Sequence, residues 1–366
     1  MAKEQSVEQD FNLNDQRPLA GEVRTYPLGE ALFFSPKPLP SARIISGGLG
    51  ESNQIVDIND TYMDIGQSNH GKAFQVQLIM FCVMLGVIVV ALIFLASAYA
   101  TQDRLGGFFE ALLLGLRDEG VVIGTILLIP LFIGWYTIIN SSLKKARQKP
   151  IRFNRQRREV CYFEEGSQTP TIVPWEEIVS WVSMYKGFTG NAIVSNVTFG
   201  IALPDSTGKD YWMFKRPVGI MEEGQRSWEI IRCYMEEESE FWAQKAGDEN
   251  RQTFDENRRQ IKQKFKNGPK PLFAMSMSDP TASYFNMFGY YVFNILCLWK
   301  LPYLVSEWDS KISMAKFPSE IDEWSKPLPK EEWAKPSDEL RKQKDVAIKH
   351  YKSGGNLTNL KLLNAE

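Results

Sequence analysis

The chain has 366 residues and a formal net charge of −2, with 42 Lys and Arg against 44 Asp and Glu. This balance gives no overall positive field that would favour nucleic acid, so we expect no nucleic-acid partner. The four cysteines (Cys82, Cys161, Cys233 and Cys297) form no CxxC pair and only two histidines are present, which argues against a disulfide framework or a zinc site. We expect no cofactor.

Residues 1–72 are rich in Gly, Pro, Ser and Asn and keep neither a helical nor a strand period for long. The composition predicts a largely irregular arm. We also expect no cleavable signal peptide, because no basic, apolar and small-residue stretches follow one another in the first 30 residues.

Two long apolar segments follow, residues 73–100 and 121–143, and neither contains a formal charge. About 20 apolar residues span a hydrocarbon core, so both predict membrane helices and residues 73–143 predict a transmembrane hairpin. Eight basic residues follow the second span before the first acid at Glu159: Lys144, Lys145, Arg147, Lys149, Arg152, Arg155, Arg157 and Arg158. The positive-inside rule then places both termini in the cytoplasm and residues 101–120 outside.

The connection 101–120 allows two arrangements. Its leucines and phenylalanines could line a short helix in the outer headgroup layer, or the helical ends of the two spans could meet in a tight turn. Gly120 and Gly124 form a GxxxG pair, which predicts a close helix–helix contact at the start of the second span. Pro130 predicts a kink within that span.

Residues 150–220 change to short strand-like segments and predict a β-rich antiparallel domain. IRF and VCYF flank the polar NRQRRE and read as a hairpin, and a PDSTGKD turn before YWMF indicates a second one. Residues 221–268 predict a long helix or helix pair, in which Trp228, Ile231, Met235 and Trp242 form one apolar stripe. We expect it to end near Asn267-Gly268-Pro269.

The remaining segment, residues 269–366, contains an apolar stretch and a tail rich in Trp and Pro. Residues 283–305 predict a buried or interfacial helix; a third span is the alternative, disfavoured by Asn and Lys inside the stretch. In the tail, Trp324-Ser325-Lys326-Pro327 is followed by Trp333-Ala334-Lys335-Pro336. Trp324 and Trp333 could dock a partner, but folding back on the body is favoured because burying tryptophan is stabilising.

Four arginines close to the second span have two interpretations: Arg152, Arg155, Arg157 and Arg158. They could continue the topology signal into a solvated turn, which we favour, or contact anionic lipid headgroups, each contributing about 1 kcal/mol.

RFNRQRREV followed by PWEEI resembles the opening of pleckstrin-homology-like domains in bacterial membrane proteins. More narrowly, two spans, PIRFNRQRREV, PWEEI and the late LPY…W…PLP…W.KPS tail resemble a poorly characterised family of proteobacterial inner-membrane proteins associated with type VI secretion, as candidate immunity or accessory proteins. The resemblance covers about residues 73–345, and its motifs are structural, so it transfers no functional residue. It implies a bacterial inner-membrane location, a periplasmic 101–120 loop and a cytoplasmic pleckstrin-like domain.

No GxSxG, HExxH, GxxxxGK[ST] or glycine-rich dinucleotide motif occurs, so we predict that the protein is not an enzyme. The expected fold class is an α+β membrane protein: a two-helix transmembrane hairpin, an antiparallel β domain and long C-terminal helices. Beyond membrane lipids, the resemblance implies a cognate secreted toxin or secretion component as partner. The alternative function is a lipid-binding membrane scaffold that uses the pleckstrin-like domain.

Overall fold

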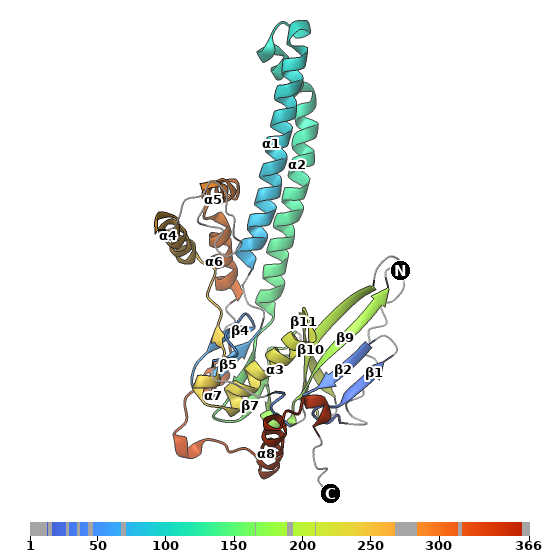
Figure 1. The fold of residues 1–366 in the computed structure, drawn as a ribbon, viewed down its shortest axis with the longest axis vertical. Coiled ribbons are helices and arrows are strands. Elements are labelled where there is room, and N and C mark those ends of the chain that lie inside the picture. The colour runs from blue at the N-terminus through green and yellow to red at the C-terminus, as the bar shows by residue number, and fades with distance from the viewer. Residues whose placement is uncertain are drawn as a thin grey trace. The chain divides into compact units, whose positions relative to one another are not determined.

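A computed structural model describes residues 13, 17–26, 29–34, 37–42, 47–66, 71–164, 166–188, 193–208, 210–267, 284–313 and 317–360. The chain divides into two compact units (Figure 1). The helix unit comprises Asn69–Gln148 and Gly247–Ala315, and the sheet unit comprises Met1–Ser68, Lys149–Ala246 and Lys316–Glu366.

The helix unit is built on a hairpin of two helices, α1 (Lys72–Leu105) and α2 (Phe108–Arg147). They have 34 and 40 residues, and both are long and apolar enough to cross a membrane. Gly106 and Gly107 join them with φ values of 87° and 140°, which glycine adopts at low cost, so the chain reverses within two residues. The predicted 101–120 connection is therefore the two helix ends meeting in a tight turn, and the alternative of a separate surface helix is wrong. Pro130 lies inside α2.

Three more helices complete this unit: α4 (Arg251–Asn267), α5 (Tyr284–Leu296) and α6 (Leu301–Ser313). The prediction of one helix over residues 283–305 is wrong, because α5 and α6 are bent by 58° at the break between them. Leu298 and Trp299 in that break have φ values of 57° and 58°, a left-handed conformation that no helix continues through. By length and composition this bent pair could form a third span, broken or re-entrant. Ser283 lies outside the described residues.

The sheet unit holds two five-stranded antiparallel sheets (Figure 1). The first has the order β1 (Val23–Tyr26), β2 (Gly29–Phe33), β9 (Val179–Phe188), β10 (Ile193–Pro204) and β11 (Tyr211–Val218). The second runs in chain order through β4 (Ile55–Ile58), β5 (Tyr62–Ile65), β6 (Ile151–Asn154), β7 (Glu159–Tyr162) and β8 (Thr171–Pro174). A small parallel pair joins β3 (Glu51–Ser52) to β12 (Gln244–Lys245).

Residues 1–72 are more regular than the predicted arm, since the short strands β1 to β5 all lie there and join the sheets of the later domain. These strands are two to five residues long. Four of them form two local hairpins, and distant partners hold these hairpins in the sheets: Phe33 is opposite Trp181 and Met63 is opposite Phe153. Segments this short leave no lasting period in the sequence. Residues 1–12 lie outside the described part of the chain.

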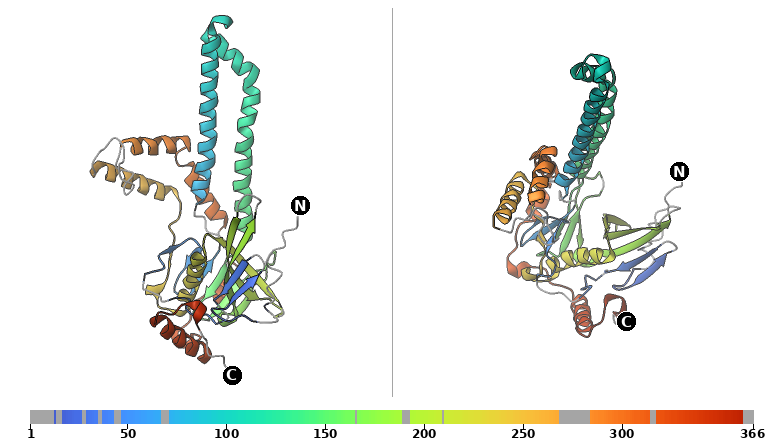
Figure 2. Two further views of the ribbon diagram at one scale, coloured as in Figure 1. Left: turned by 45° about the vertical axis from the view of Figure 1, so that its right-hand side comes forward. Right: turned by 45° about the horizontal axis from the view of Figure 1, so that its top comes forward.

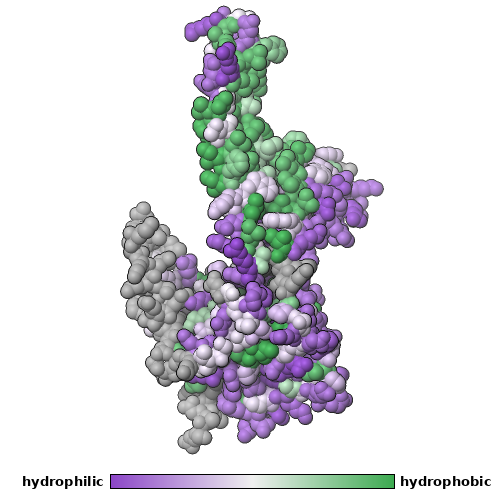
Figure 3. All heavy atoms as spheres, turned by 180° about the vertical axis from the view of Figure 1, so that it is seen from behind, coloured by the Kyte–Doolittle hydropathy of each residue, from purple (hydrophilic) through white to green (hydrophobic). Residues whose placement is uncertain are grey.

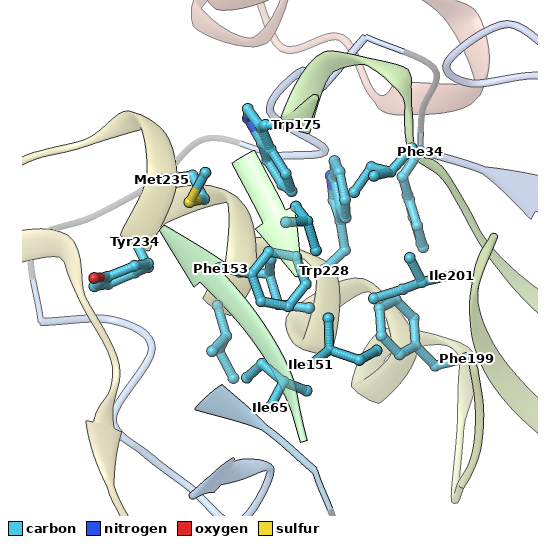
Figure 4. Packing of buried hydrophobic residues seen from close by; sticks show 14 of the residues in the cluster. Phe34, Ile65, Ile151, Phe153, Trp175, Phe199, Ile201, Trp228, Tyr234 and Met235 are labelled. Atoms are coloured by element: carbon cyan, nitrogen blue, oxygen red, sulfur yellow. The ribbon is translucent and has the colours of Figure 1, made fainter. Parts of the chain in front are cut away.

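Helix α3 (Met221–Glu236) follows β11 and supplies the centre of the core (Figure 4). The indole of Trp228 stacks on Phe34 from the arm, with ring centroids 6.2 Å apart, and on Trp175, 5.6 Å away. Ala347 and Tyr351, from helix α8 (Asp338–Lys352) in the tail, belong to the same core cluster. Arm, middle and tail thus share one core.

Of the two arrangements expected for residues 221–268, a long helix or a helix pair, the structure has two separate helices. Helix α3 ends at Glu236, and α4 begins at Arg251 in the other unit. Trp242 of the predicted stripe lies beyond a short 3₁₀ turn (Ser239–Phe241), where its ring centroid is 4.9 Å from that of Tyr234. Asn267 is the last residue of α4, and Gly268 and Pro269 lie outside the described residues. The coarse expectation of an antiparallel α+β fold with two long apolar helices is confirmed.

Candidate functional site

The four predicted site arginines lie on the arginine hairpin, formed by β6, the turn 155–158 and β7. The turn is completed at Arg158, whose φ of 54° is left-handed. The side chain of Asn154 caps the turn by accepting hydrogen bonds from the backbone N–H groups of Gln156 and Arg157, both at 3.1 Å. The turn therefore forms as predicted, but the arginines do not extend into solvent.

Arg152 is 5% exposed. Its guanidinium donates two hydrogen bonds to the Asp64 carboxylate, both at 2.7 Å, and a third to Ser325 Oγ at 2.8 Å. The aromatic rings of Tyr62 and Phe317 lie 3.8 and 4.0 Å from the guanidinium carbon. A paired and stacked guanidinium of this kind ties three segments of the chain together.

Arg158 is equally enclosed. Its Nη2 donates to Glu236 at 2.6 Å and to Glu176 at 3.2 Å, while the indole N–H of Trp175 donates to Glu236 at 2.8 Å. Ser337, at the start of α8, donates its backbone N–H to Glu176 at 3.0 Å and its hydroxyl at 2.6 Å. Burial alone would raise the pKa of Glu176, but the Ser337 hydrogen bonds and the Arg158 charge outweigh it and lower that pKa.

Arg155 and Arg157 face the tail. The guanidinium carbon of Arg155 lies 4.6 Å from the Trp242 ring and 5.7 Å from the Trp333 ring, and its Nη2 donates to the Glu237 carbonyl at 3.1 Å. Arg157 donates to the carbonyl of Trp324 at 2.9 Å. The hairpin thus contacts residues 317–337, which we call the tail strap.

Both predicted docking tryptophans are part of this strap, and both are half-buried. The Trp324 indole donates to Glu159 at 2.8 Å, and the Trp333 indole donates to the Leu328 carbonyl at 3.0 Å. Gln156 also holds the strap: its side-chain oxygen accepts from the backbone N–H of Leu328, and its carbonyl accepts from that of Ala334. The strap is folded back on its own unit, the favoured of the two interpretations.

Gly120 and Gly124 do not lie at a helix contact among the described residues: a Cβ added at either would meet no atom within 4 Å. Close approach occurs at other glycines of the hairpin. A Cβ at Gly134 would lie 2.8 Å from Ile79 Cγ2, and one at Gly86 would lie 3.2 Å from Leu127 Cδ2. Small residues do permit the contact, but at positions outside the GxxxG pair.

A buried polar cluster that the sequence reasoning missed lies at the base of the hairpin. Asp309 of α6 has no exposed surface, and it accepts a short hydrogen bond from Ser142. The ammonium groups of Lys145 and Lys72 lie 3.2 and 3.5 Å from its carboxylate. The sequence did contain one sign of this buried acid. Asp309 follows the apolar Val305 by four residues, so the two side chains lie on the same, buried face of the helix. Glu249 accepts from the backbone N–H groups of Gly71 and Ala73 at the start of α1.

Helices α4, α5 and α6 form a wing on this base (Figure 2). Rings at both ends show that α4 and α5 run antiparallel: Phe265 meets Tyr284 with centroids 5.2 Å apart, and Phe254 meets Trp299 at 5.4 Å. A cavity of about 290 Å³ opens between the wing and α1. Its lining residues are Gln77, Phe254, Asn257, Gln260, Ile261, Lys264, Tyr290, Phe293, Asn294 and Tyr303.

Two cysteines of the sheet unit, Cys161 and Cys233, are buried. Burial raises the pKa of the Cys161 and Cys233 thiols to about 12, so the nucleophilic thiolate is disfavoured. Among the residues that the structure describes, no group of three or more His, Cys, Asp or Glu side chains could hold a metal ion.

Residues 126–330 match DUF6708, a family of unknown function, over more than half of the chain. The chain belongs to this family. No curated protein and no solved structure matches this chain. The DUF6708 region includes most of α2, the arginine hairpin, the wing and the first part of the tail strap, so the features above lie largely within the family's shared segment.

Proposed function

We propose that the protein is a two-span protein of the bacterial inner membrane and that it acts by binding another protein. The observation that carries the membrane part is the outer surface of the hairpin. Only 6% of the most apolar window of each helix is buried within the structure, so the apolar side chains of α1 and α2 face outward (Figure 3). In water this surface would be strongly unfavourable, whereas a bilayer covers it.

The proposed orientation has both chain ends in the cytoplasm and the Gly106–Gly107 turn in the periplasm. Its support is the distribution of charge: Lys144, Lys145 and Arg147 end α2, while the turn region has Arg104 and Arg117 among four acids, Asp103, Glu110, Asp118 and Glu119. Both five-stranded sheets are then cytoplasmic.

Protein binding is favoured over the lipid-scaffold alternative by the state of the arginine hairpin. That alternative needs cations that reach lipid headgroups, but Arg152 and Arg158 are buried and paired with carboxylates. The resemblance to a family associated with type VI secretion supports an immunity or accessory role, with a secreted toxin or a secretion component as the partner.

The test is purification of the full-length protein from its native membranes in mild detergent, followed by mass spectrometry of what accompanies it. An unrelated two-span protein of similar abundance, purified in the same way, is the control. We expect a stoichiometric partner that the control lacks. If deletion of the gene also sensitises cells to that partner, delivered by sibling cells, the immunity form is supported. Recovery of lipids alone, or full extraction of the protein by carbonate, would contradict the proposal.

A further inference from the structure

The wing cavity combines two kinds of surface. Five lining side chains are apolar or aromatic (Phe254, Ile261, Phe293, Tyr290 and Tyr303), and four are amides (Gln77, Asn257, Gln260 and Asn294). Lys264 is the single charged side chain among the lining residues that the structure describes. A ligand that suits these lining residues has a hydrocarbon part for the apolar wall, oxygen atoms that accept hydrogen bonds from the amides, and a negative charge that pairs with the Lys264 ammonium.

The charge of α4 favours the same occupant. Its sequence has six basic residues against Asp255 and Glu256. Asn257, Gln260 and Lys264 are spaced by three and four residues, so they form one flank of the helix, and this flank lines the cavity. Phe254 and Ile261 form the neighbouring apolar face of α4. An amphipathic basic helix of this pattern is typical of the surface of an anionic leaflet.

With the proposed insertion, the cavity lies at the depth of a headgroup layer. Gln77 follows Lys72 by five residues, which is about 8 Å along α1 from its basic end. Around it the surface is apolar: Phe74 and Leu78 of α1 are 60% and 51% exposed, and Phe288 and Ile295 of α5 are exposed even more. In Figure 3 the apolar surface of the hairpin continues onto the wing, whose outer part is hydrophilic.

From these observations we infer that the wing cavity binds one anionic phospholipid from the leaflet around the base of the hairpin. Its phosphate pairs with Lys264, its ester and glycerol oxygens accept from the amides, and the start of one acyl chain lies against the aromatic wall. A volume of about 290 Å³ suits a headgroup and the first part of a chain rather than a whole lipid. The inference rests on the proposed membrane insertion and adds a site that the arginine hairpin does not provide.

The experiment is native mass spectrometry of the full-length protein in detergent, with phosphatidylglycerol or phosphatidylcholine added at equal concentration. We expect one phosphatidylglycerol to be retained in preference to phosphatidylcholine. Lys264→Glu should weaken this retention at least about fivefold, since a cation at an anionic surface contributes about 1 kcal/mol. Gln260→Trp fills the cavity without changing the charge and should also reduce retention.

Lys262→Glu is the matched control, because Lys262 is an exposed residue of the same helix that does not line the cavity. It should leave the single retained phosphatidylglycerol in place. Equal losses for the Lys262 and Lys264 variants would overturn the site, since they would indicate a diffuse charge effect. Displacement of the lipid by an equal concentration of glycerol 3-phosphate would overturn the assignment to a lipid, because a headgroup alone would then suffice.

Carbonate extraction separates this inference from the proposed function. A protein that stays in carbonate-washed membranes but shows no preference for phosphatidylglycerol contradicts the cavity assignment alone. A protein that carbonate releases contradicts the membrane insertion on which both rest.

Discussion

Replacing Arg152 with methionine tests whether the arginine hairpin is a structural tie. The substitution keeps a long apolar stem but removes the charge and leaves the Asp64 carboxylate buried without its partner. Breaking a buried pair from one side costs about 3–5 kcal/mol. In a unit of this size, 1 kcal/mol shifts the melting temperature by about 2–4 °C, so we expect Arg152→Met to lower it by about 6–20 °C.

The assay is thermal unfolding of the full-length protein in detergent, followed by tryptophan fluorescence; seven of the ten tryptophans, including Trp175 and Trp228, lie in the sheet unit. Arg341→Met is the control, because the Arg341 side chain is 57% exposed and pairs with an 84% exposed Asp338. Its effect should be within about 0.5 kcal/mol. Adding Asp64→Asn to Arg152→Met should cost less than the sum of the two single changes, because no buried charge then remains unpaired.

A lipid-contact role for Arg152 predicts a different pattern. The Arg152→Met variant would then melt like the Arg341→Met variant and differ from it only in binding to anionic vesicles. That result would refute the structural reasoning.

Three further predictions concern acid stability, the base of the hairpin and helix contact. Glu176 and Glu237 have pKa values below their usual 4.5; for Glu237 this is because Arg232 and Lys344 outweigh its burial. The stabilisation from both carboxylates is present above pH 4.5 and is lost as the pH falls through the lowered pKa values. The melting temperature should therefore drop below about pH 4.5, and it should drop less in Glu176→Gln. An equal acid sensitivity in this variant would contradict the assignment. Asp309→Asn should lower the melting temperature strongly, because the enclosed ammonium groups of Lys72 and Lys145 lose their counter-ion. The control Asp322→Asn, at an exposed residue, should not lower it. Equal melting temperatures for the two variants would contradict this prediction. Gly134→Leu should destabilise the hairpin of α1 and α2 by about 1–3 kcal/mol, because the new side chain overlaps Ile79. Gly120→Leu is the control, because its side chain would meet open space. A lower melting temperature for Gly120→Leu than for Gly134→Leu would instead support the predicted helix contact at Gly120 and Gly124.

The sequence was sufficient for features that depend on local composition. The two apolar helices follow from uninterrupted hydrophobic segments, and the arginine hairpin follows from two short strand patterns around a polar turn. The helices only continue further than predicted, since residues near the turn are helix formers and two glycines suffice for the reversal.

Features that depend on distant partners could not be predicted in this way. The β1–β2 and β4–β5 hairpins join the sheets through β2, which pairs with β9, and β5, which pairs with β6, about 85 to 155 residues later in the chain, while β3 pairs with β12. The environment of the arginines has the same origin: Arg152 reaches back to Asp64 and forward to Ser325. A run of arginines beside a membrane span has the same sequence whether its charges are solvated or enclosed.

The wing was missed for a related reason. Residues 283–305 are apolar enough for a span, but the left-handed Leu298 and Trp299 divide them into α5 and α6, which are bent by 58°. Neither residue favours that conformation by itself, and the local signal of a new helix is Pro302 in the first turn of α6. The cavity depends on this bend, because α5 and α6 supply four of its lining residues.

The central claim, a two-span membrane protein with both ends in the cytoplasm, is tested most directly by labelling single introduced cysteines in intact cells with a membrane-impermeant maleimide. The parent chain gives the background of its four native cysteines, of which Cys161, Cys233 and Cys297 are buried and Cys82 lies within α1. Gly107→Cys, in the turn, should be labelled from outside, and Lys342→Cys, on α8, should be labelled only after the cells are opened. Labelling of Lys342→Cys in intact cells, with Gly107→Cys protected, would contradict the account.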